Sequence, residues 1–385
     1  MNRFTSVLLL TIILLSVGRA EIPADSLIEK FLYSIQYGLA AGDAEALNQH
    51  IKMDKLLDKS LHGLAVTKKM EQELKSEFNK QFNFGAEIIQ GMGEDGHYMA
   101  MNYDTSSDTI RALFRLAGMN IGVNYHQFDI IYDRDFEIID VYIYLSGEYL
   151  SDTFRILIEP MLLNTDSFTD YLKSMGEQIF GEKRRYINEL PKLAEMKQAR
   201  IAGDFQKAHE IYLSMASSVQ KMKAVQLLHI ICISNISNDL MVEYVEKFRD
   251  SYPDDPSLDL LLIDYFLVKQ DYKASLAALH RLSQNVGEDD GYLHYMMGNI
   301  YYAQKEFGLY EQYQKMAIEL EPWLAEPHYQ LIELYLENRN FSGVVAMMVS
   351  LEENAGMAFS DDAMQANELF SEFLKSDAYK QWRTQ

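Results

Sequence analysis

The chain has 385 residues, of which 48% are apolar and 24% are charged, with only 7 Pro and 20 Gly. This composition excludes collagen-like, intrinsically disordered and disulfide-scaffold proteins, and the length favours two structural units over one. With 35 Lys and Arg against 57 Asp and Glu, the formal net charge is −22. Because so acidic a chain repels phosphate groups, we expect it to bind neither nucleic acid nor anionic membranes.

Residues 1–20 have the three parts of a secretory signal peptide. A polar start contains Arg3, an apolar run follows from Val7 to Val17, and Gly18-Arg19-Ala20 places small residues at both positions that determine cleavage. The apolar run is shorter than the ~20 residues needed to span a bilayer. The sequence therefore predicts cleavage after Ala20 and a mature chain that is exported, soluble and either periplasmic or secreted, with no membrane span.

The first half of the mature chain, residues 21–180, predicts an α+β domain in which helices pack on one face of an antiparallel sheet. Helical periodicity precedes a run of segments with a period of two. The expected helices are residues 24–62, as a pair, then 68–82 and 153–163, and the expected strands are residues 97–103, 109–117, 121–132 and 136–145. The helix pair with its Ala-Gly-Asp turn, followed by a curved sheet, resembles the nuclear-transport-factor-2-like cone fold. A cystatin-like fold and an unrelated α+β fold remain alternatives.

The second half, residues 183–358, repeats itself at an interval of 33 to 35 residues, with units starting at 189, 222, 256, 291 and 325. The clearest unit, residues 291–324, resembles a tetratricopeptide repeat. Its Leu-Gly position is held by Met297-Gly298, its Tyr position by Tyr301, its turn aromatic by Phe307, its second small position by Ala317 and its final proline by Pro322. The unit from 222 is the weakest, with Asn238 at the turn. The resemblance implies an all-α solenoid of five helix pairs, entered near Glu182–Arg185.

Some residues depart from the repeat pattern. Tyr310 stands where the pattern has Ala, and Ile332, Ile263 and His229 stand where it has Gly. Uneven spacing between the helices is therefore expected. After the last repeat, apolar residues recur at helical spacing from Ser360 to Trp382, which predicts a capping helix within residues 359–385.

The resemblance also implies a binding surface, because the first helices of such repeats line a groove through positions 2, 5, 9, 12 and 13 of each unit. In this chain those positions hold Tyr292, Tyr295, Asn299 and Tyr302 in the fourth unit, and Glu326, Tyr329, Glu333 and Glu337 in the fifth. Aromatic rings with carboxylates suit a protein or peptide partner that carries basic or aromatic groups. Tyr295 replaces the Lys with which some members clamp a C-terminal carboxylate, so chaperone-tail binding is not expected. The groove could instead be filled by the chain's own capping segments.

No pattern in the sequence predicts catalysis, a cofactor or a metal. The nine His include no HExxH pair, no GxSxG segment is present, and no acidic cluster matches a calcium loop. The sequence therefore predicts a non-enzymatic protein-interaction scaffold. An alternative is small-ligand binding or hydrolysis in a cavity of the N-terminal domain, with His126 and Asp129 as the first candidates. A further alternative is self-association through an exposed face of the sheet.

Overall fold

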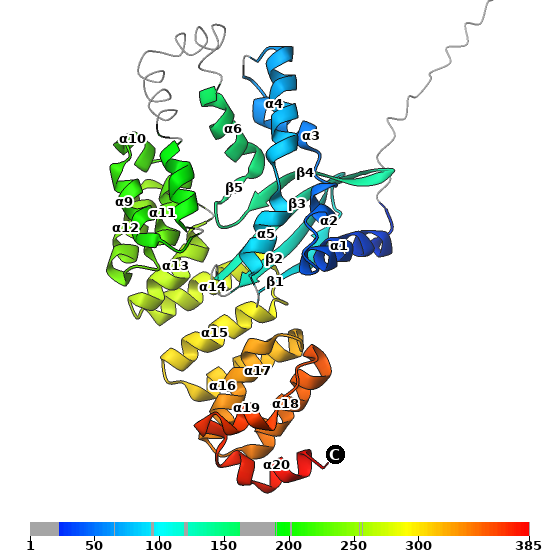
Figure 1. Ribbon diagram of the computed structural model, residues 1–385, viewed down its shortest axis with the longest axis vertical. Coiled ribbons are helices and arrows are strands. Elements are labelled where there is room, and N and C mark those ends of the chain that lie inside the picture. The colour runs from blue at the N-terminus through cyan, green and yellow to red at the C-terminus, as the bar shows by residue number, and fades with distance from the viewer. Residues whose placement is uncertain are drawn as a thin grey trace, which may run out of the picture.

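Figure 1 shows the computed structural model of the chain, in which residues 23–64, 66–93, 96–118, 122–161, 189, 191–200, 202–253, 255 and 257–384 are described. The predicted signal peptide and the predicted boundary near Glu182 lie outside these residues. An α+β domain is followed by an all-helical array, as predicted. The array packs its helices consecutively, which is consistent with a solenoid.

The N-terminal domain places a helical segment before an antiparallel meander. The strands pair in the order β1-β2-β3-β4-β5. Its elements are α1 (Asp25–Ala40), α2 (Glu45–Asn48), α3 (Met53–Leu61), α4 (Lys68–Gln81), α5 (Phe84–Met92), β1 (His97–Asp104), β2 (Ile110–Gly118), β3 (Gly122–Asp133), β4 (Asp135–Ile143), β5 (Glu148–Tyr149) and α6 (Leu150–Met161). The four longer strands agree with the predicted ranges to within two residues at each end.

Helix α5 follows the helical stretch whose end was predicted at Phe82. Asn83 starts it by accepting a hydrogen bond from the Ala86 amide. Gly85 brings it close to α2, because a Cβ there would lie 2.4 Å from the carbonyl oxygen of Ala44. The glycines that permit this packing also lower helix propensity, which hides the helix in the sequence.

The sheet is the middle layer of the molecule, because successive side chains of a strand point to opposite faces. On β2, Phe114 and Leu116 pack among α1 to α6. Leu113, with Val123 and Tyr125 of β3, packs instead among the helices of the array. At these three residues the face that could have mediated self-association is covered by the chain itself.

The helical array continues from a helix at residues 191–200. Its elements are α9 (Phe205–Ser214), α10 (Ser217–Gln220), α11 (Lys223–Ile233), α12 (Asn238–Ser251), α13 (Leu258–Val268), α14 (Tyr272–Val286), α15 (Gly291–Ala303), α16 (Phe307–Leu320), α17 (Ala325–Glu337) and α18 (Phe341–Ala355). Apart from the short α10, they form successive pairs. Among the longer helices α13 to α18, the most extensive contacts join helices that are neighbours in the chain.

A recurring turn joins the two helices of four pairs. One residue in each turn has a positive φ, namely Gly203, Gln270, Lys305 and Arg339. The amide of the next residue donates to the carbonyl five residues back, as in Glu306 to Tyr301, which is the Schellman geometry. The pair α11–α12 has no positive φ at its turn, and it belongs to the unit whose sequence fits the repeat least well.

The end of the chain differs from its prediction. In place of one capping helix there are four short segments, α19 (Asp361–Gln365), η2 (Glu368–Phe370), η3 (Phe373–Lys375) and α20 (Asp377–Trp382). Asn367 and Ser376 each accept a backbone hydrogen bond and so start a new segment where a long helix would have continued. Met364 and Phe373 are nevertheless buried against the last helix pair.

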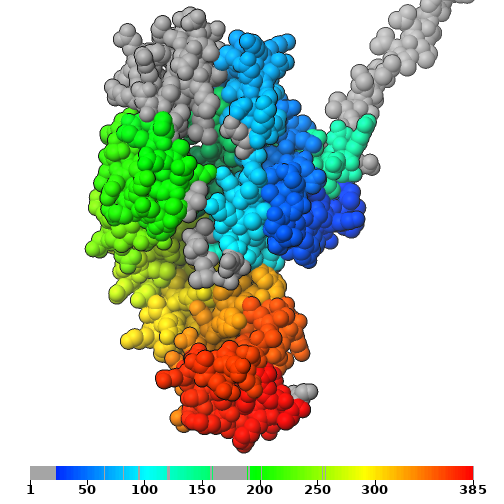
Figure 2. Space-filling model, in the orientation of Figure 1, coloured from blue at the N-terminus to red at the C-terminus, as the bar shows by residue number. Residues whose placement is uncertain are grey.

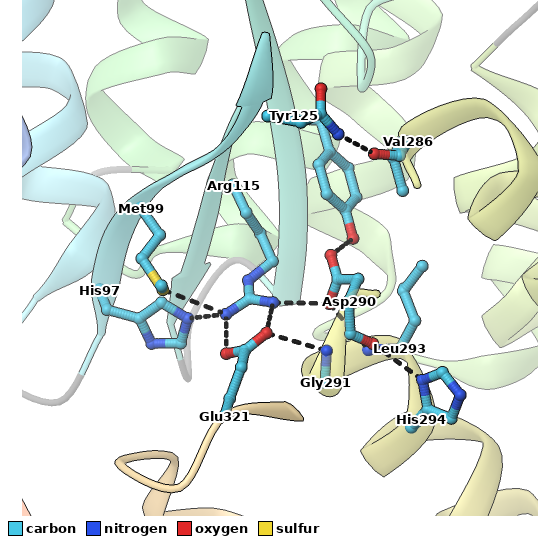
Figure 3. A network of polar contacts seen from close by, with 11 residues as sticks. His97, Met99, Arg115, Tyr125, Val286, Asp290, Gly291, Leu293, His294 and Glu321 are labelled. Carbon is cyan, nitrogen blue, oxygen red and sulfur yellow. Dashed lines mark hydrogen bonds and ion pairs between the residues drawn. The ribbon is translucent and has the colours of Figure 1, made fainter. Parts of the chain in front are cut away.

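The two parts meet at a buried polar network around Arg115 of β2 (Figure 3). Arg115 is fully buried, and its guanidinium donates to Asp290 Oδ1 at 2.5 Å and to the two oxygens of Glu321 at 2.7 and 2.6 Å. Asp290 also accepts from the Tyr125 hydroxyl and caps α15 at the Leu293 amide. Glu321 accepts from the Gly291 amide. Both carboxylates therefore join the sheet to the start of α15.

His97 of β1 completes the network on its other side. Arg115 donates to His97 Nε2 at 3.0 Å, and because a guanidinium can only donate, His97 is neutral with its proton on Nδ1. Burial, followed by the positive charge of Arg115, lowers the pKa of His97 to about 3. In the space-filling view the blue and cyan domain lies directly against the yellow and orange helices (Figure 2).

Replacing Arg115 by Met leaves two buried carboxylates without their cation. We expect Arg115→Met to lower the free energy of unfolding by about 3–5 kcal/mol, measured by urea denaturation. Arg281→Met is the matched control, because Arg281 forms an ion pair with Asp259 in which its side chain is 50% exposed, and removing such a pair costs less than about 1 kcal/mol. Equal losses in the two variants would contradict the structural role of the Arg115 network.

The turn at Lys305 carries a side chain in a backbone conformation that costs an L-residue roughly 1–2 kcal/mol. We expect Lys305→Gly to raise the free energy of unfolding by about 0.5–1 kcal/mol. This gain is smaller than the strain that is relieved, because glycine also increases the conformational entropy of the unfolded chain. Lys305→Ala removes the same charge but keeps Cβ, and should bring no gain. Thermal denaturation of the three proteins measures the difference, and an equal effect of Gly and Ala would refute the argument.

Candidate functional site

Two rows of side chains follow one face of α15 and one face of α17. Tyr292, Tyr295, Asn299 and Tyr302 are spaced by three, four and three residues along α15. Glu326, Glu333 and Glu337 are spaced by seven and four along α17. Residues at these intervals share one side of a helix. The predicted groove positions therefore form two continuous rows.

The rows come together in a depression of about 220 Å³ between the two helices. Its lining residues are Asn299, Tyr302, Tyr310, Gln330, Glu333 and Leu334, and we call it the Tyr302 pocket. Three of the eight predicted groove residues, Asn299, Tyr302 and Glu333, are among them. Tyr310 had been singled out only as a departure from the repeat pattern, and Gln330 and Leu334 had not been considered.

Two amide side chains, Asn299 and Gln330, form the polar floor of the Tyr302 pocket, and a third, Gln314, lies buried behind them. Gln314 of α16 is fully buried, and its Nε2 donates to Asn299 Oδ1 at 3.2 Å and to Gln330 Oε1 at 2.9 Å. Gly298 makes room for Gln314, since a Cβ there would lie 2.7 Å from Nε2. Gln314 Oε1 itself has no partner among the described residues. Hydrogen bonds from Gln314 thus fix the two floor side chains in place.

Aromatic rings form one wall of the pocket. The ring of Tyr302 lies 5.0 Å from that of Tyr310 and 5.7 Å from that of Phe307. Tyr302 is 51% exposed, whereas Tyr310 is buried and donates from its hydroxyl to Gln330 Oε1 at 3.2 Å. Burial, followed by the nearby Glu333 carboxylate, raises the pKa of Tyr310. Tyr310 therefore remains a neutral donor, and Tyr302 is the ring offered to solvent.

Three other predicted residues, Tyr292, Tyr295 and Tyr329, lie in the same rows but outside the Tyr302 pocket. Tyr292 is half-buried, with its ring 6.0 Å from that of His97 and 5.4 Å from the Arg115 guanidinium carbon. Tyr295 lies next to it, 5.4 Å away between ring centres. Tyr329 donates its hydroxyl to Met357 Sδ, which follows α18. The chain thus supplies contacts of its own at Tyr292 and Tyr329, although Tyr329 stays 47% exposed, close to the 51% of Tyr302.

A second and larger depression, of about 570 Å³, lies across α14, α15 and α16. His280, Glu288, His294 and Glu319 are among its lining residues. None of the predicted binding residues lines it. It is separate from the Tyr302 pocket, with which it shares no lining residue.

The N-terminal candidates for catalysis do not form a pair. His126 is buried between the Tyr98 hydroxyl, 3.2 Å from Nδ1, and the Asn124 amide, 3.1 Å from Nε2. Asp129 stands three residues along β3, which places it on the opposite face, 4.0 Å from Lys59 and Arg111. Because both ring nitrogens of His126 are occupied within the core, the pairing with Asp129 that we expected for the hydrolytic alternative is wrong.

Metal and membrane features are absent from the part of the chain that the structure describes. No three His, Cys, Asp or Glu side chains there are grouped to hold a metal ion. Nor does any of the described helices have the length and apolarity to cross a bilayer.

Buried histidines, among them His126 and His229, make the stability of the fold depend on pH. Burial lowers the pKa of His126 to about 3, and burial with the adjacent His209 lowers the pKa of His229 to about 3, whereas unfolded His titrates near 6.5. The unfolded chain therefore binds more protons between these values, so stability is complete above pH 6.5 and falls as pH drops toward 3. Each of these two histidines should lower the free energy of unfolding by about 2 kcal/mol at pH 5 relative to pH 7.

His229→Phe should remove its share of this dependence, because phenylalanine keeps the ring that stacks 3.6 Å from Tyr212 but takes up no proton. The measurement is the free energy of unfolding in urea at pH 7 and pH 5. The exposed His280, changed to Gln, is the control and should leave the difference between the two pH values unchanged. An unchanged difference in His229→Phe would contradict the assignment.

No protein-family model matches the chain, and no curated protein matches it.

Proposed function

We propose that this chain is an exported protein-interaction scaffold that holds a protein or peptide partner along the face of α15 and α17. The observation that carries the proposal is the Tyr302 pocket, in which Asn299, Tyr302 and Glu333 from two successive helix pairs meet beside a polar floor. Exposed aromatic rings over a fixed polar base are typical of the residues that dominate protein interfaces. The function is binding, without catalysis or a cofactor.

The repeat family is part of the same proposal. We assign the array to the tetratricopeptide-repeat class and the N-terminal domain to the nuclear-transport-factor-2-like class. The recurring turn at Gly203, Gln270, Lys305 and Arg339 supports the first assignment, since its spacings of 67, 35 and 34 residues are multiples of about 34. The early helices packed on a meander sheet support the second.

Export is proposed from the sequence of residues 1–20, and the charge of the chain agrees with the partner class. A net charge of −22 attracts basic partners and speeds their association, and it disfavours nucleic acid. The carboxylates of Glu326, Glu333 and Glu337 lie on the proposed binding face itself. The expected partner is therefore a protein or peptide with basic or aromatic groups.

Tyr302→Ala tests the proposal. The full mature chain is immobilised and exposed to a periplasmic or secreted extract, and the captured proteins are identified and quantified by mass spectrometry. Loss of a central aromatic anchor should lower capture of the main partner by about 10- to 30-fold, since such truncations cost about 2 kcal/mol. Substitution at a half-exposed ring should leave the fold intact, which circular dichroism checks.

Tyr37→Ala is the matched control, because Tyr37 is also an exposed tyrosine but lies on α1 of the N-terminal domain. It should capture as much as the unsubstituted chain. Equal capture by Tyr302→Ala and Tyr37→Ala would place the binding site elsewhere.

A further inference from the structure

The rim of the Tyr302 pocket is negatively charged. Glu333 lines it and is exposed, and Glu337 stands one turn further along α17. No Lys or Arg is among the lining residues, and no described residue forms an ion pair with Glu333. A group that enters the pocket therefore meets a carboxylate whose charge is not already compensated.

The aromatic wall of the pocket suits a cation. A cation over a tyrosine face gains about 0.5–2 kcal/mol, and arginine makes this contact more often than lysine. Such contacts occur elsewhere in the molecule. The Arg115 guanidinium carbon lies 5.4 Å from the centre of the Tyr292 ring, and Lys247 Nζ lies 4.2 Å from that of Tyr244. In the pocket, Tyr302 has aromatic neighbours, and no Lys or Arg of the described residues lies over its ring.

The floor supplies oxygen atoms rather than further charge. Asn299 and Gln330 line the pocket, and each side-chain oxygen accepts a hydrogen bond from the buried Gln314, which orients them. A guanidinium offers five N–H donors in a plane, which can pair with a carboxylate, stack on a ring and reach an amide oxygen at once. An ammonium group is a compact point charge that is more strongly hydrated, so it makes less use of this arrangement.

We propose that the Tyr302 pocket binds one arginine side chain of the partner, with the guanidinium paired to Glu333 and stacked on Tyr302. This inference rests on the proposed function, to which it adds the residue type that the partner presents. The volume of about 220 Å³ is that of a site for a single long side chain.

The experiment begins with a random 12-residue peptide library selected on the full mature chain. The selected peptides are synthesised with a fluorophore, and their affinities are measured by fluorescence polarisation. In each peptide arginine is replaced in turn by lysine and by citrulline, which has nearly the same shape but no charge. We expect arginine at one position in the selected peptides and a loss of about 3- to 30-fold on replacement by citrulline, with lysine in between.

Glu333→Gln should lower the affinity of the arginine peptide by about 2- to 5-fold, the range of an exposed ion pair, and should leave the affinity of the citrulline peptide unchanged. Glu319→Gln is the matched control, because Glu319 is also exposed but lines the second depression. It should change neither affinity.

The outcomes separate the inference from the proposed function. Peptides that lose affinity in Tyr295→Ala or Tyr302→Ala, but bind equally well with citrulline and in Glu333→Gln, would overturn the arginine pocket and leave the scaffold standing. Selection that yields no binder, or binders insensitive to every variant on α15 and α17, would overturn both.

Discussion

The arrangement of the molecule depends on one buried guanidinium. Arg115 projects from the face of β2 that meets the array and compensates two carboxylates at the start of α15 and the end of α16. Buried carboxylates without a cation are strongly unfavourable. Asp290 and Glu321 can therefore be buried only while the sheet holds Arg115 beside them. Gly291 is part of the same constraint, because a Cβ there would lie 2.9 Å from the Glu321 side chain. The array is therefore one structural unit with the N-terminal domain.

That constraint decides which part of the α15–α17 face is available to a partner. Because Arg115 and His97 lie against Tyr292, the start of the α15 row is occupied by the sheet. Further along the proposed face, Tyr329 contacts Met357 but stays 47% exposed, close to the 51% of Tyr302. The surroundings of Tyr302 come from the last two helix pairs. The N-terminal domain thus limits the proposed binding surface at the start of α15.

Local patterns in the sequence predicted the elements but not the contacts between distant residues. The alternation of apolar and polar side chains predicted the four long strands. The recurrence at about 34 residues predicted the helix pairs and the two rows of groove positions on α15 and α17. The Arg115 network joins residues 175 and 206 positions apart, and no periodicity relates them. The single capping helix failed because Asn367 and Ser376 start new segments, which apolar spacing alone does not reveal. Gln314 escaped notice because a glutamine on a helix is ordinarily exposed.

The most informative sequence signal for the site was a misfit to the repeat pattern. The pattern expects a small residue at position 310, where two helices come close, and the chain has tyrosine. That ring is buried, and its hydroxyl reaches the backbone carbonyl of Gln330 at 3.3 Å as well as its side chain. The Tyr310 hydroxyl therefore links α16 to α17. Tyr310 also lines the Tyr302 pocket, so the residue that weakens the match to the repeat is part of the candidate site.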